Sequence, residues 1–433
     1  MIYSEKTPQQ FHGQLPAETS VLIIGGGIIG VCTAYYLAKQ GAKVTLCEKG
    51  RVAGEQSSRN WGWIRQQGRD EPEIPLSIEA RHLWEKLSKE TDEDLGYSAT
   101  GVYYLAEKRG DLEDFEKFVE LGRKYDLGTS MISSAQVHEA IKGKQGRWIG
   151  GMHTASDGRA EPGQATLGIA RAAERLGATI CENTAVRTLV KSGGNVVGAV
   201  TEHGEIKAEQ IVLAGGAWSS LFAANAGLKL PQLAVELTVA ATQAVPDVFP
   251  ANASDNTFAM RRRQDGGYTI ALKNNQTHHL GPDSFRYLRE WLPNMVQNLK
   301  GTRIKPWSPK NYPDQWMQNR RWTDADTSPF EVMRVLNSKP NQKELAALTT
   351  AFADRFPQLK GTKLSHAWGG LIDAMPDFLP VIDRAPADEN LHIVTGFSGH
   401  GFGIGPSIGR LMADVLAGKQ AGHDLSSFAF NRF

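Results

Sequence analysis

The chain has few cysteines, almost no net charge and no long apolar run. Its 433 residues include only 3 cysteines, and 48 Lys and Arg residues against 47 Asp and Glu residues give a formal net charge of +1. A nearly neutral chain gives no reason to expect binding to nucleic acid or to an acidic membrane surface. No apolar stretch reaches the roughly 20 residues that a transmembrane helix needs. These absences favour a globular protein without an integral membrane anchor.

The cysteines Cys32, Cys47 and Cys181 lie in apolar segments and form no C-x-x-C pair. We interpret them as packing residues in a reducing compartment. The start of the chain lacks a basic stretch followed by an apolar one, so we expect no signal peptide and a cytoplasmic location. Because no H-E-x-x-H motif or Cys/His cluster is present, we predict no metal site. His278 and His279 are interpreted as a pair in a loop rather than as ligands.

The clearest positive signal is a strand, a glycine turn and a helix near the start of the chain. Residues 21–24 are aliphatic, as a buried strand requires, and residues 31–40 have helical apolar spacing. Between them, Gly25, Gly27 and Gly30 fit the pattern G-x-G-x-x-G. In that pattern the glycines allow a tight turn, the close approach of a pyrophosphate and close packing of the helix on the strand.

A second short strand over residues 44–47 ends at Glu48, about 20 residues after the glycines. A carboxylate at this position can accept a hydrogen bond from a ribose hydroxyl. Strand, turn, helix and acid therefore predict a dinucleotide site, with Glu48 favouring an adenosine ribose that carries no 2′-phosphate. This pattern by itself leaves NAD and FAD open.

The length and the pattern of elements predict two domains. Nucleotide-domain character starts the chain, resumes in the middle, and returns at the end as an apolar strand, a glycine loop and a helix. Strands over residues 101–107 and 233–245, a hairpin turning at 265–267 and a mostly helical stretch with Pro-rich breaks over 282–356 lie in the gaps. We predict an α/β nucleotide domain from residues 1–95, 151–228 and 361–433, and an α+β domain, built on a mixed or antiparallel sheet with helices, from residues 96–150 and 229–360.

Six motifs in chain order resemble the D-amino-acid-oxidase superfamily of FAD enzymes, which includes glycine and sarcosine oxidases. They are the glycine turn with Glu48, SSRNWG at 57–62, DGRAEP at 157–162, VLAGGAWS at 212–219, MPDFLPVI at 375–382 and GFSGHGFGIGP at 396–406. Within that group the chain is most similar to bacterial L-amino acid deaminases, a group of L-amino acid oxidases, and to L-pipecolate oxidases. It departs from the deaminases in lacking their N-terminal membrane helix and in its residues beside the flavin, Trp61, Trp63 and His400.

The resemblance implies a Rossmann-like domain that holds FAD, without a covalent attachment. The loop before the last helix adds a physical argument, because free N–H groups and the positive end of a helix dipole would stabilise negative charge on the flavin. The residues implied to bind FAD are Gly25, Gly26, Gly27, Ile28, Ile29, Gly30, Glu48, Lys49, Gln56, Ser57, Ser58, Asn60, Trp61, Gly62, Val186, Ala214, Gly215, Gly216, Trp218, Gly370, Gly399, His400, Gly401, Phe402, Gly403 and Ile404.

Oxidation of an amino acid at a flavin needs a clamp for the carboxylate, and arginine suits this because its planar fork donates two parallel hydrogen bonds. By similarity to the deaminases, Arg261, just before the predicted turn, is the expected clamp and a catalytic residue. His400 is expected to line the substrate pocket and to orient the substrate or tune the flavin. Trp63 and Trp368 are expected as apolar walls of that pocket. Arg59 and Arg65 are further candidates that sequence reasoning does not place.

The expected reaction is oxidation of an amino acid, L rather than D, by hydride transfer from Cα to the flavin. Water then converts the imino acid to a 2-oxo acid and ammonia. Because the sequence shows no anchor, we expect O2 as acceptor, giving H2O2, with a quinone as the alternative. L-pipecolate or other cyclic imino acids, D-amino acids and N-methyl amino acids stay open as substrates, as do a non-catalytic flavin-binding electron carrier and a homo-oligomer.

Overall fold

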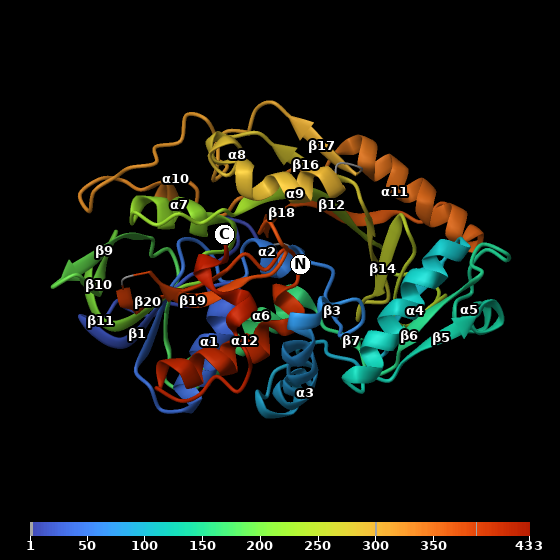
Figure 1. Ribbon diagram of the computed structural model, residues 1–433, viewed down its shortest axis with the longest axis horizontal. Coiled ribbons are helices and arrows are strands. Elements are labelled where there is room, and N and C mark those ends of the chain that lie inside the picture. The colour runs from blue at the N-terminus through green and yellow to red at the C-terminus, as the bar shows by residue number, and fades with distance from the viewer. Residues whose placement is uncertain (1–2, 299–300, 387) are drawn as a thin grey trace.

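The computed structural model describes residues 3–298, 301–386 and 388–433, and most of its strands belong to two large sheets (Figure 1). The first sheet has the order β19-β20-β11-β1-β2-β8, with β10 beside β11 and β9 beside β10. Its strands are β1 Glu18–Ile24, β2 Val44–Cys47, β8 Thr179–Cys181, β9 Val186–Ser192, β10 Asn195–Thr201, β11 Gly204–Leu213, β19 Val381–Ala385 and β20 Asp388–Thr395. The pairs from β8 through β2, β1 and β11 to β20 are parallel, as expected when helices make the crossovers.

Helices from distant parts of the chain pack together against the first sheet (Figure 1). They are α1 Ile28–Lys39, α3 Ile74–Glu90, α6 Pro162–Arg175 and α12 Gly401–Leu416. In α1 every residue but the last is buried, because α6 and α12 both pack on it. At Gly409 a β-carbon would overlap the backbone of Cys32, so this glycine sets how closely α12 approaches α1.

The second sheet has the order β17-β16-β12-β15-β14-β13-β4-β6-β5, with β18 beside β12. Its strands are β4 Val102–Ala106, β5 Thr129–Ser133, β6 Gly150–Thr154, β12 Leu233–Thr242, β13 Asn252–Ser254, β14 Phe258–Arg262, β15 Tyr268–Leu272, β16 Gln276–His279, β17 Thr302–Lys305 and β18 Leu364–Ala374. The helices α4 Arg109–Lys124, α5 Ser134–Ala140 and α11 Gln342–Arg355 pack on it. Phe352 of α11 stacks on Phe258 of β14, with ring centroids 6.2 Å apart, in the core of this half.

Shorter elements connect the two sheets. They are α2 Gln56–Arg59, β3 Trp63–Ile64, β7 Gly158–Arg159, α7 Ser219–Asn225, α8 Pro282–Arg286, α9 Leu288–Asn298, α10 Pro329–Val332 and the 3-10 helices η1 Glu71–Glu73, η2 Gly216–Trp218, η3 Pro357–Leu359, η4 Ser426–Phe428 and η5 Phe430–Arg432. Among the described residues, no helix is both long enough and apolar enough to cross a membrane.

The predicted fold class, an α/β part with a discontinuous nucleotide-type sheet and a second sheet with helices, is confirmed. Two strands join a different sheet from the one that the predicted segments give them. β6 lies in the second sheet between β4 and β5, and β18 pairs with β12 along almost its whole length. The division into domains stays a prediction. Its segments assign β6 and β18 to the nucleotide domain, although both strands belong to the second sheet.

Two local predictions are wrong. Residues 306–328, expected to be mostly helical, contain neither helix nor strand. Long-range contacts hold this stretch instead: the Tyr312 hydroxyl lies 3.0 Å from Glu236 Oε1, and the Trp322 indole N–H donates to Arg187 O at 2.8 Å. His278 and His279 lie in strand β16 rather than in a loop, and the His279 ring bonds to Glu236 at 3.0 Å.

Candidate active site

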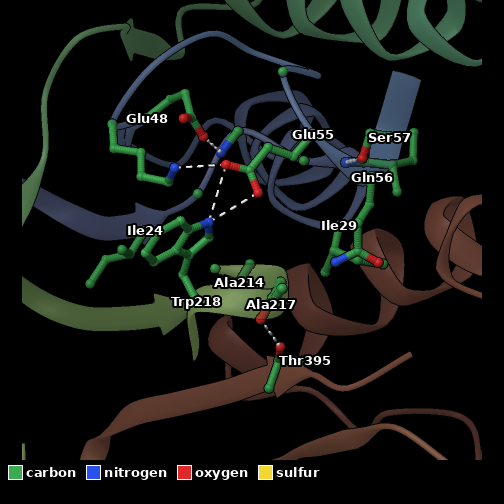
Figure 2. A pocket seen from close by; sticks show the side chains of 18 of the residues that line it. Ile24, Ile29, Glu48, Glu55, Gln56, Ser57, Ala214, Ala217, Trp218 and Thr395 are labelled. Atoms are coloured by element: carbon green, nitrogen blue, oxygen red, sulfur yellow. Dashed lines mark hydrogen bonds and ion pairs between the residues drawn. The ribbon is translucent and has the colours of Figure 1, made fainter. Parts of the chain in front are cut away.

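A cavity of about 1180 Å³, here called the glycine-turn cavity, opens at the carboxyl ends of β1, β2 and β11. The last residues of these strands, Ile24, Cys47 and Leu213, all line it. This edge is where open parallel sheets bind their ligands. Figure 2 shows Glu48, Glu55 and Trp218 grouped around one part of the cavity, with Ser57 and Ile29 farther along.

The turn after β1 needs glycine for steric reasons. Gly25 has a φ of 115°, and a β-carbon there would also overlap Ala214 O on the neighbouring strand. At Gly30 a β-carbon would overlap Gly25 O, so only glycine lets α1 start directly against the turn. The Ser57 hydroxyl accepts a hydrogen bond from the first helical N–H, that of Ile28, at 2.8 Å.

Glu48 is held at the end of β2 by two backbone N–H groups. Gly26 N donates to Oε2 and Gly50 N donates to Oε1, both at 2.7 Å. Burial raises the pKa of Glu48 to about 7, although Lys49 and these two hydrogen bonds act against the shift. The carboxylate therefore lies in the cavity wall with its lone pairs only partly used, as binding of ribose hydroxyls requires.

Sequence reasoning missed the acid Glu55, which joins this wall to a distant segment. Its carboxylate accepts from Lys49 Nζ at 2.7 Å, from the Trp218 indole at 3.0 and 3.1 Å, and from Leu336 N at 3.0 Å. Burial opposes its ionisation, but Lys49, the hydrogen bond from Leu336 N and the charge of Arg59 together hold the pKa of Glu55 below its usual range.

The segment that contains α10 covers one side of the glycine-turn cavity. Phe330 and Arg334 line the cavity, and Lys49 Nζ donates to the carbonyls of Met333 and Arg334 at 2.8 and 3.0 Å. A β-carbon at Gly50 would overlap Arg334 O. The Lys49 side chain is therefore held against the backbone of residues 333–334, and Gly50 lets the two segments approach closely.

The start of α12 forms the other end of the cavity. Gly401 and Phe402 line it, so the helix N-terminus and its unpaired N–H groups border the space. The preceding loop is fixed by Asp373, which accepts from Gly396 N at 2.9 Å. Burial raises the pKa of Asp373 to about 6.

Most of the predicted cofactor residues line the glycine-turn cavity, and the rest lie next to it. Those that line it are Gly25, Gly26, Gly27, Ile28, Ile29, Glu48, Lys49, Gln56, Ser57, Asn60, Val186, Ala214, Gly215, Gly216, Trp218, Gly399, Gly401 and Phe402. Those in the adjoining pocket are Trp61, Gly62, Gly370, His400 and Gly403. Ser58 borders another cavity, whereas Gly30 and Ile404 are packed into the fold.

The adjoining pocket, here called the Trp63 pocket, has a volume of about 1290 Å³. It shares Gln56, Asn60, Gly399 and Phe402 with the glycine-turn cavity, so the two spaces meet at the start of α12. Its aromatic wall is made by Trp61, Trp63 and Tyr104, and the two tryptophan rings lie edge to face at 5.7 Å.

Four cationic side chains line the Trp63 pocket, and no Asp or Glu is among its described lining residues. The cations are Arg59, Arg65, Arg69 and Lys273. Arg65 is one of the two arginines that the sequence could not place, and Lys273 was missed. Lys273 directly follows β15, and the sequence pattern alone does not show that it returns to the side of Arg65.

His400 lines the Trp63 pocket and is held from behind by Glu73. The ring Nδ1 lies 2.9 Å from Glu73 Oε2, and Glu73 is fully buried. Burial lowers the pKa of His400, and Arg69 adds to this. Burial opposes ionisation of Glu73, but His400 and Arg69 hold its pKa below the usual range. Since an ionised carboxylate only accepts, Nδ1 carries the proton and Nε2 of the neutral ring is an acceptor.

Asp70, Glu73 and His400 bring three atoms that could ligate a metal within 4.8 Å of one another. Arg69 lies at the same place, with Nη1 3.8 Å from Glu73 Oε2. The positive charge of this guanidinium, next to the three potential ligands, would repel a divalent cation. The prediction of no metal site stays a prediction.

The structure does not place Arg261 where the sequence predicted it. Its guanidinium is buried and paired with Glu161, with Nη1–Oε1 and Nη2–Oε2 distances of 2.8 and 3.0 Å. It lines a separate polar space of about 890 Å³, the Arg261 cavity, together with Arg263 and Trp368. Arg261 therefore packs behind Gly62 of the Trp63 pocket rather than into it.

Trp368 is also outside the Trp63 pocket, because its indole N–H is held by Arg59 O at 3.0 Å on the side of the Arg261 cavity. Of the four predicted substrate residues, Trp63 and His400 line the Trp63 pocket, and Arg261 and Trp368 do not. Arg261 lies in a strand, β14, as the alternating pattern of the hairpin predicted. Its side chain, however, pairs with Glu161 and does not line the Trp63 pocket.

The sequence pattern of the FAD dependent oxidoreductase family matches residues 20–415. The chain belongs to this family. Its relatives include the beta subunit of sarcosine oxidase from Arthrobacter sp, 27% identical over 95% of this chain and 90% of that protein. Glycine oxidase from Pseudomonas aeruginosa is 23% identical over 94% of this chain and 98% of that protein.

Two solved structures of L-amino acid deaminases have nearly the same fold. The enzyme from Proteus myxofaciens, in complex with anthranilate, has a TM-score of 0.93 at 27% identity, with 100% of both chains covered. The enzyme from Proteus vulgaris has a TM-score of 0.92 at 28% identity, with 98% of this chain and 100% of that chain covered. The resemblance to FAD enzymes of the amino acid oxidase type, stated from the sequence motifs, is confirmed.

FAD is the cofactor of this FAD dependent oxidoreductase, as predicted, and the residues present fit it. The glycine turn provides a cradle that any β-carbon at Gly25 or Gly30 would fill, which matches the approach of a pyrophosphate. Glu48 offers free lone pairs at the end of β2 for ribose hydroxyls. The start of α12 borders both the glycine-turn cavity and the Trp63 pocket, where a flavin would need its reactive edge.

Proposed function

We propose that this protein oxidises an L-α-amino acid to the imino acid, which water hydrolyses to the 2-oxo acid and ammonia. The observation that carries the proposal is the Trp63 pocket, which is aromatic, cationic and continuous with the glycine-turn cavity. The fold shared with the two Proteus L-amino acid deaminases supports the L configuration. A plain electron carrier would have no use for a large cationic pocket at this position.

Different residues of the Trp63 pocket bind the substrate carboxylate and exclude water. A substrate carboxylate pairs with Arg65 or Lys273, whose charges no carboxylate of the lining neutralises. The Trp63 indole N–H, which has no hydrogen-bond partner in the part of the chain that the structure describes, is a further donor in the same wall. FAD, when bound, supplies the acceptor for the hydride that leaves Cα. Trp61 and Trp63 keep water away from that carbon.

His400 and Glu73 control the proton beside the pocket. With Nδ1–H held on Glu73, the free Nε2 of neutral His400 accepts a hydrogen bond from the substrate ammonium group and orients it. The amine gives up a proton as the hydride leaves Cα, and the lowered pKa of His400 keeps the ring unprotonated and ready to accept near neutral pH.

The test is anaerobic mixing of the FAD-loaded protein with a panel of L- and D-amino acids, sarcosine and L-pipecolate, followed by flavin absorbance. We expect bleaching with L-amino acids and little or none with their D enantiomers. Anthranilate, which pairs an amine with a carboxylate, serves as a dead-end ligand and should perturb the flavin spectrum without bleaching it. Bleaching by sarcosine or by D-amino acids alone would replace the proposal with the corresponding oxidase, and no bleaching by any amine would refute it.

The electron acceptor follows from the same preparation. After reduction by the best substrate, the protein is mixed with oxygenated buffer or with a soluble quinone. We predict fast reoxidation by O2 with formation of H2O2. Slow reoxidation by O2 with fast reoxidation by quinone would make the protein a dehydrogenase.

A further inference from the structure

The Trp63 pocket contains more positive charge than one substrate carboxylate can neutralise. Among the described residues, neither Arg65 nor Lys273 makes an ion pair with any Asp or Glu. Arg65 Nη1 donates to Gln67 O, a neutral acceptor. Lys273 Nζ lies 5.4 Å from the centroid of the Tyr104 ring, and Arg65 Cζ lies 6.0 Å from the same centroid. Both cations therefore lie near the same ring without a contacting carboxylate from the described part of the chain, although Asp111 and Asp255 act on Lys273, and Glu73 and Asp157 on Arg65, from a greater distance.

The other two cations of the lining are already satisfied. Arg59 donates to the carbonyls of Leu336 and Tyr3. Arg69 lies 3.8 Å from Glu73, so its charge is balanced inside the protein. Of the lining cations, Arg65 and Lys273 therefore keep N–H donors free for a ligand, and both line the same pocket.

Holding two half-buried cations near the same ring is costly unless a ligand neutralises them. Burial lowers the pKa of Lys273, and the charge of Arg65 lowers it further. A substrate with one carboxylate would relieve only one of the two cations. A substrate with two would relieve both and leave the pocket electrically balanced.

We propose that the natural substrate is a dicarboxylic amine, one carboxylate pairing with Arg65 and the other with Lys273. The inference rests on the amine oxidation proposed above and names its substrate class; of the two sources below, the first keeps the proposed release of ammonia and the second releases an amino acid instead. Two sources share this chemistry: an α-amino acid with an acidic side chain, and a secondary amine that carries a carboxylate on each of two substituents. In both, oxidation removes a hydride from the carbon next to nitrogen and a proton from nitrogen, and water hydrolyses the resulting imine.

The first test compares matched substrates in the anaerobic reduction of the FAD-loaded protein. L-glutamate and L-aspartate are paired with L-glutamine and L-asparagine, which keep the size and remove the charge. Iminodiacetate and N-(carboxymethyl)-L-alanine, paired with sarcosine, represent the second source. We expect one of the two acidic sets to exceed its neutral partners by about 10- to 100-fold in reduction rate over dissociation constant, the effect of one charged hydrogen bond. The set that does so identifies the source.

The second test needs no turnover. Glutarate and butyrate differ by one carboxylate, and their binding is read from the perturbed flavin spectrum. We expect glutarate to bind about 10-fold or more tightly than butyrate, and Lys273→Met and Arg65→Met each to abolish that preference. Lys273→Arg should keep it, and Lys360→Met, at an exposed lysine outside all three cavities, should not change it.

The outcomes separate this inference from the proposed function. If neutral L-amino acids reduce the flavin as well as the acids, or if glutarate binds no better than butyrate to the wild-type protein, the inference is wrong and the proposed function stands. If no amine reduces the flavin, the proposed function is wrong, and the glutarate comparison still decides whether the pocket takes two carboxylates. Because that comparison uses the wild-type protein, a variant that fails to fold does not remove the test.

Discussion

The glycine-turn cavity and the Trp63 pocket meet at the start of α12, but they are built in opposite ways. The first is formed largely by backbone, with a glycine turn at the end of β1 and Glu48 held by two N–H groups at the end of β2. The second is formed by side chains from β3 and the loop after it, from β4 and from the residues after β15. A backbone site follows from a local motif, whereas a side-chain site depends on which distant segments meet.

The arginines show the consequence. Arg261 and Arg65 have the same chemistry, and sequence reasoning assigned a role only to Arg261. In the fold Arg261 is neutralised by Glu161 and Arg65 is not neutralised by any carboxylate of its pocket. Whether an arginine serves the structure or a ligand is thus decided by the counter-charge that tertiary packing brings to it.

The largest effect is expected at the backbone site. In Gly30→Ala the new methyl group would overlap Gly25 O, and we expect loss of FAD binding and of most soluble protein. Gly110→Ala in α4 is the matched control, because a β-carbon there meets open space. It should keep FAD and gain about 0.5–1 kcal/mol of stability. FAD content and thermal unfolding measure both, and a yellow, stable Gly30→Ala protein would contradict the steric argument.

Arg261→Met should next reduce stability rather than substrate binding. It leaves the half-buried Glu161 with only Gln264 N at 2.8 Å and Arg159 at 3.8 Å, so the loss should be about 1–3 kcal/mol, below the cost of orphaning a fully buried charge. Denaturant unfolding of the FAD-loaded protein measures the loss, and substrate titration of the folded fraction should give an unchanged dissociation constant. Weakened substrate binding at wild-type stability would return Arg261 to the role that the sequence predicted.

Glu48→Gln should weaken FAD binding by about 10- to 100-fold, the range for loss of a charged hydrogen bond. The wild-type pKa of about 7 adds a pH signature. As pH falls through 7, Glu48 takes up a proton and loses acceptor capacity, so wild-type affinity for FAD should fall. The Gln variant lacks this titration, and its affinity should be flat over the same range. Fluorescence titration with FAD from pH 6 to pH 8 checks both statements, and a parallel fall in the variant would assign the effect elsewhere.

The smallest effect is expected at the positioning residue Glu73. Glu73→Gln removes a charge that raises the pKa of His400, so the pKa of His400 should fall further. In a plot of the flavin-reduction rate against pH, we expect the inflection set by the pKa of His400 to move to lower pH. The maximal rate should change less than about 10-fold. Stopped-flow reduction over a pH series measures this. An unmoved limb with a lower rate at all pH values would indicate a purely structural role.

The success of the sequence analysis follows the same division between backbone and side chain. The glycine turn and Glu48 were found because their spacing is local and each glycine has a steric reason. Glu55 and Lys273 were missed because their roles come from partners far along the chain: Leu336 for the first, and Arg65 and Tyr104 for the second. The break in the expected helical stretch is longer than the prolines indicate, because tertiary contacts rather than periodicity hold residues 306–328.

The sequence by itself determined the strand–turn–helix unit through short-range spacing, since glycine sterics and apolar periodicity act over a few residues. It determined FAD through the resemblance of six motifs to a family, and the presence of two kinds of sheet, but not the sheet that β6 and β18 join. Tertiary structure alone decided that Arg261 pairs with Glu161, that Lys273 comes to lie near Arg65, and that Glu73 lies behind His400. The reason is physical: the charge state and use of an ionisable side chain depend on its neighbours in space, and those are set by the packing of whole elements.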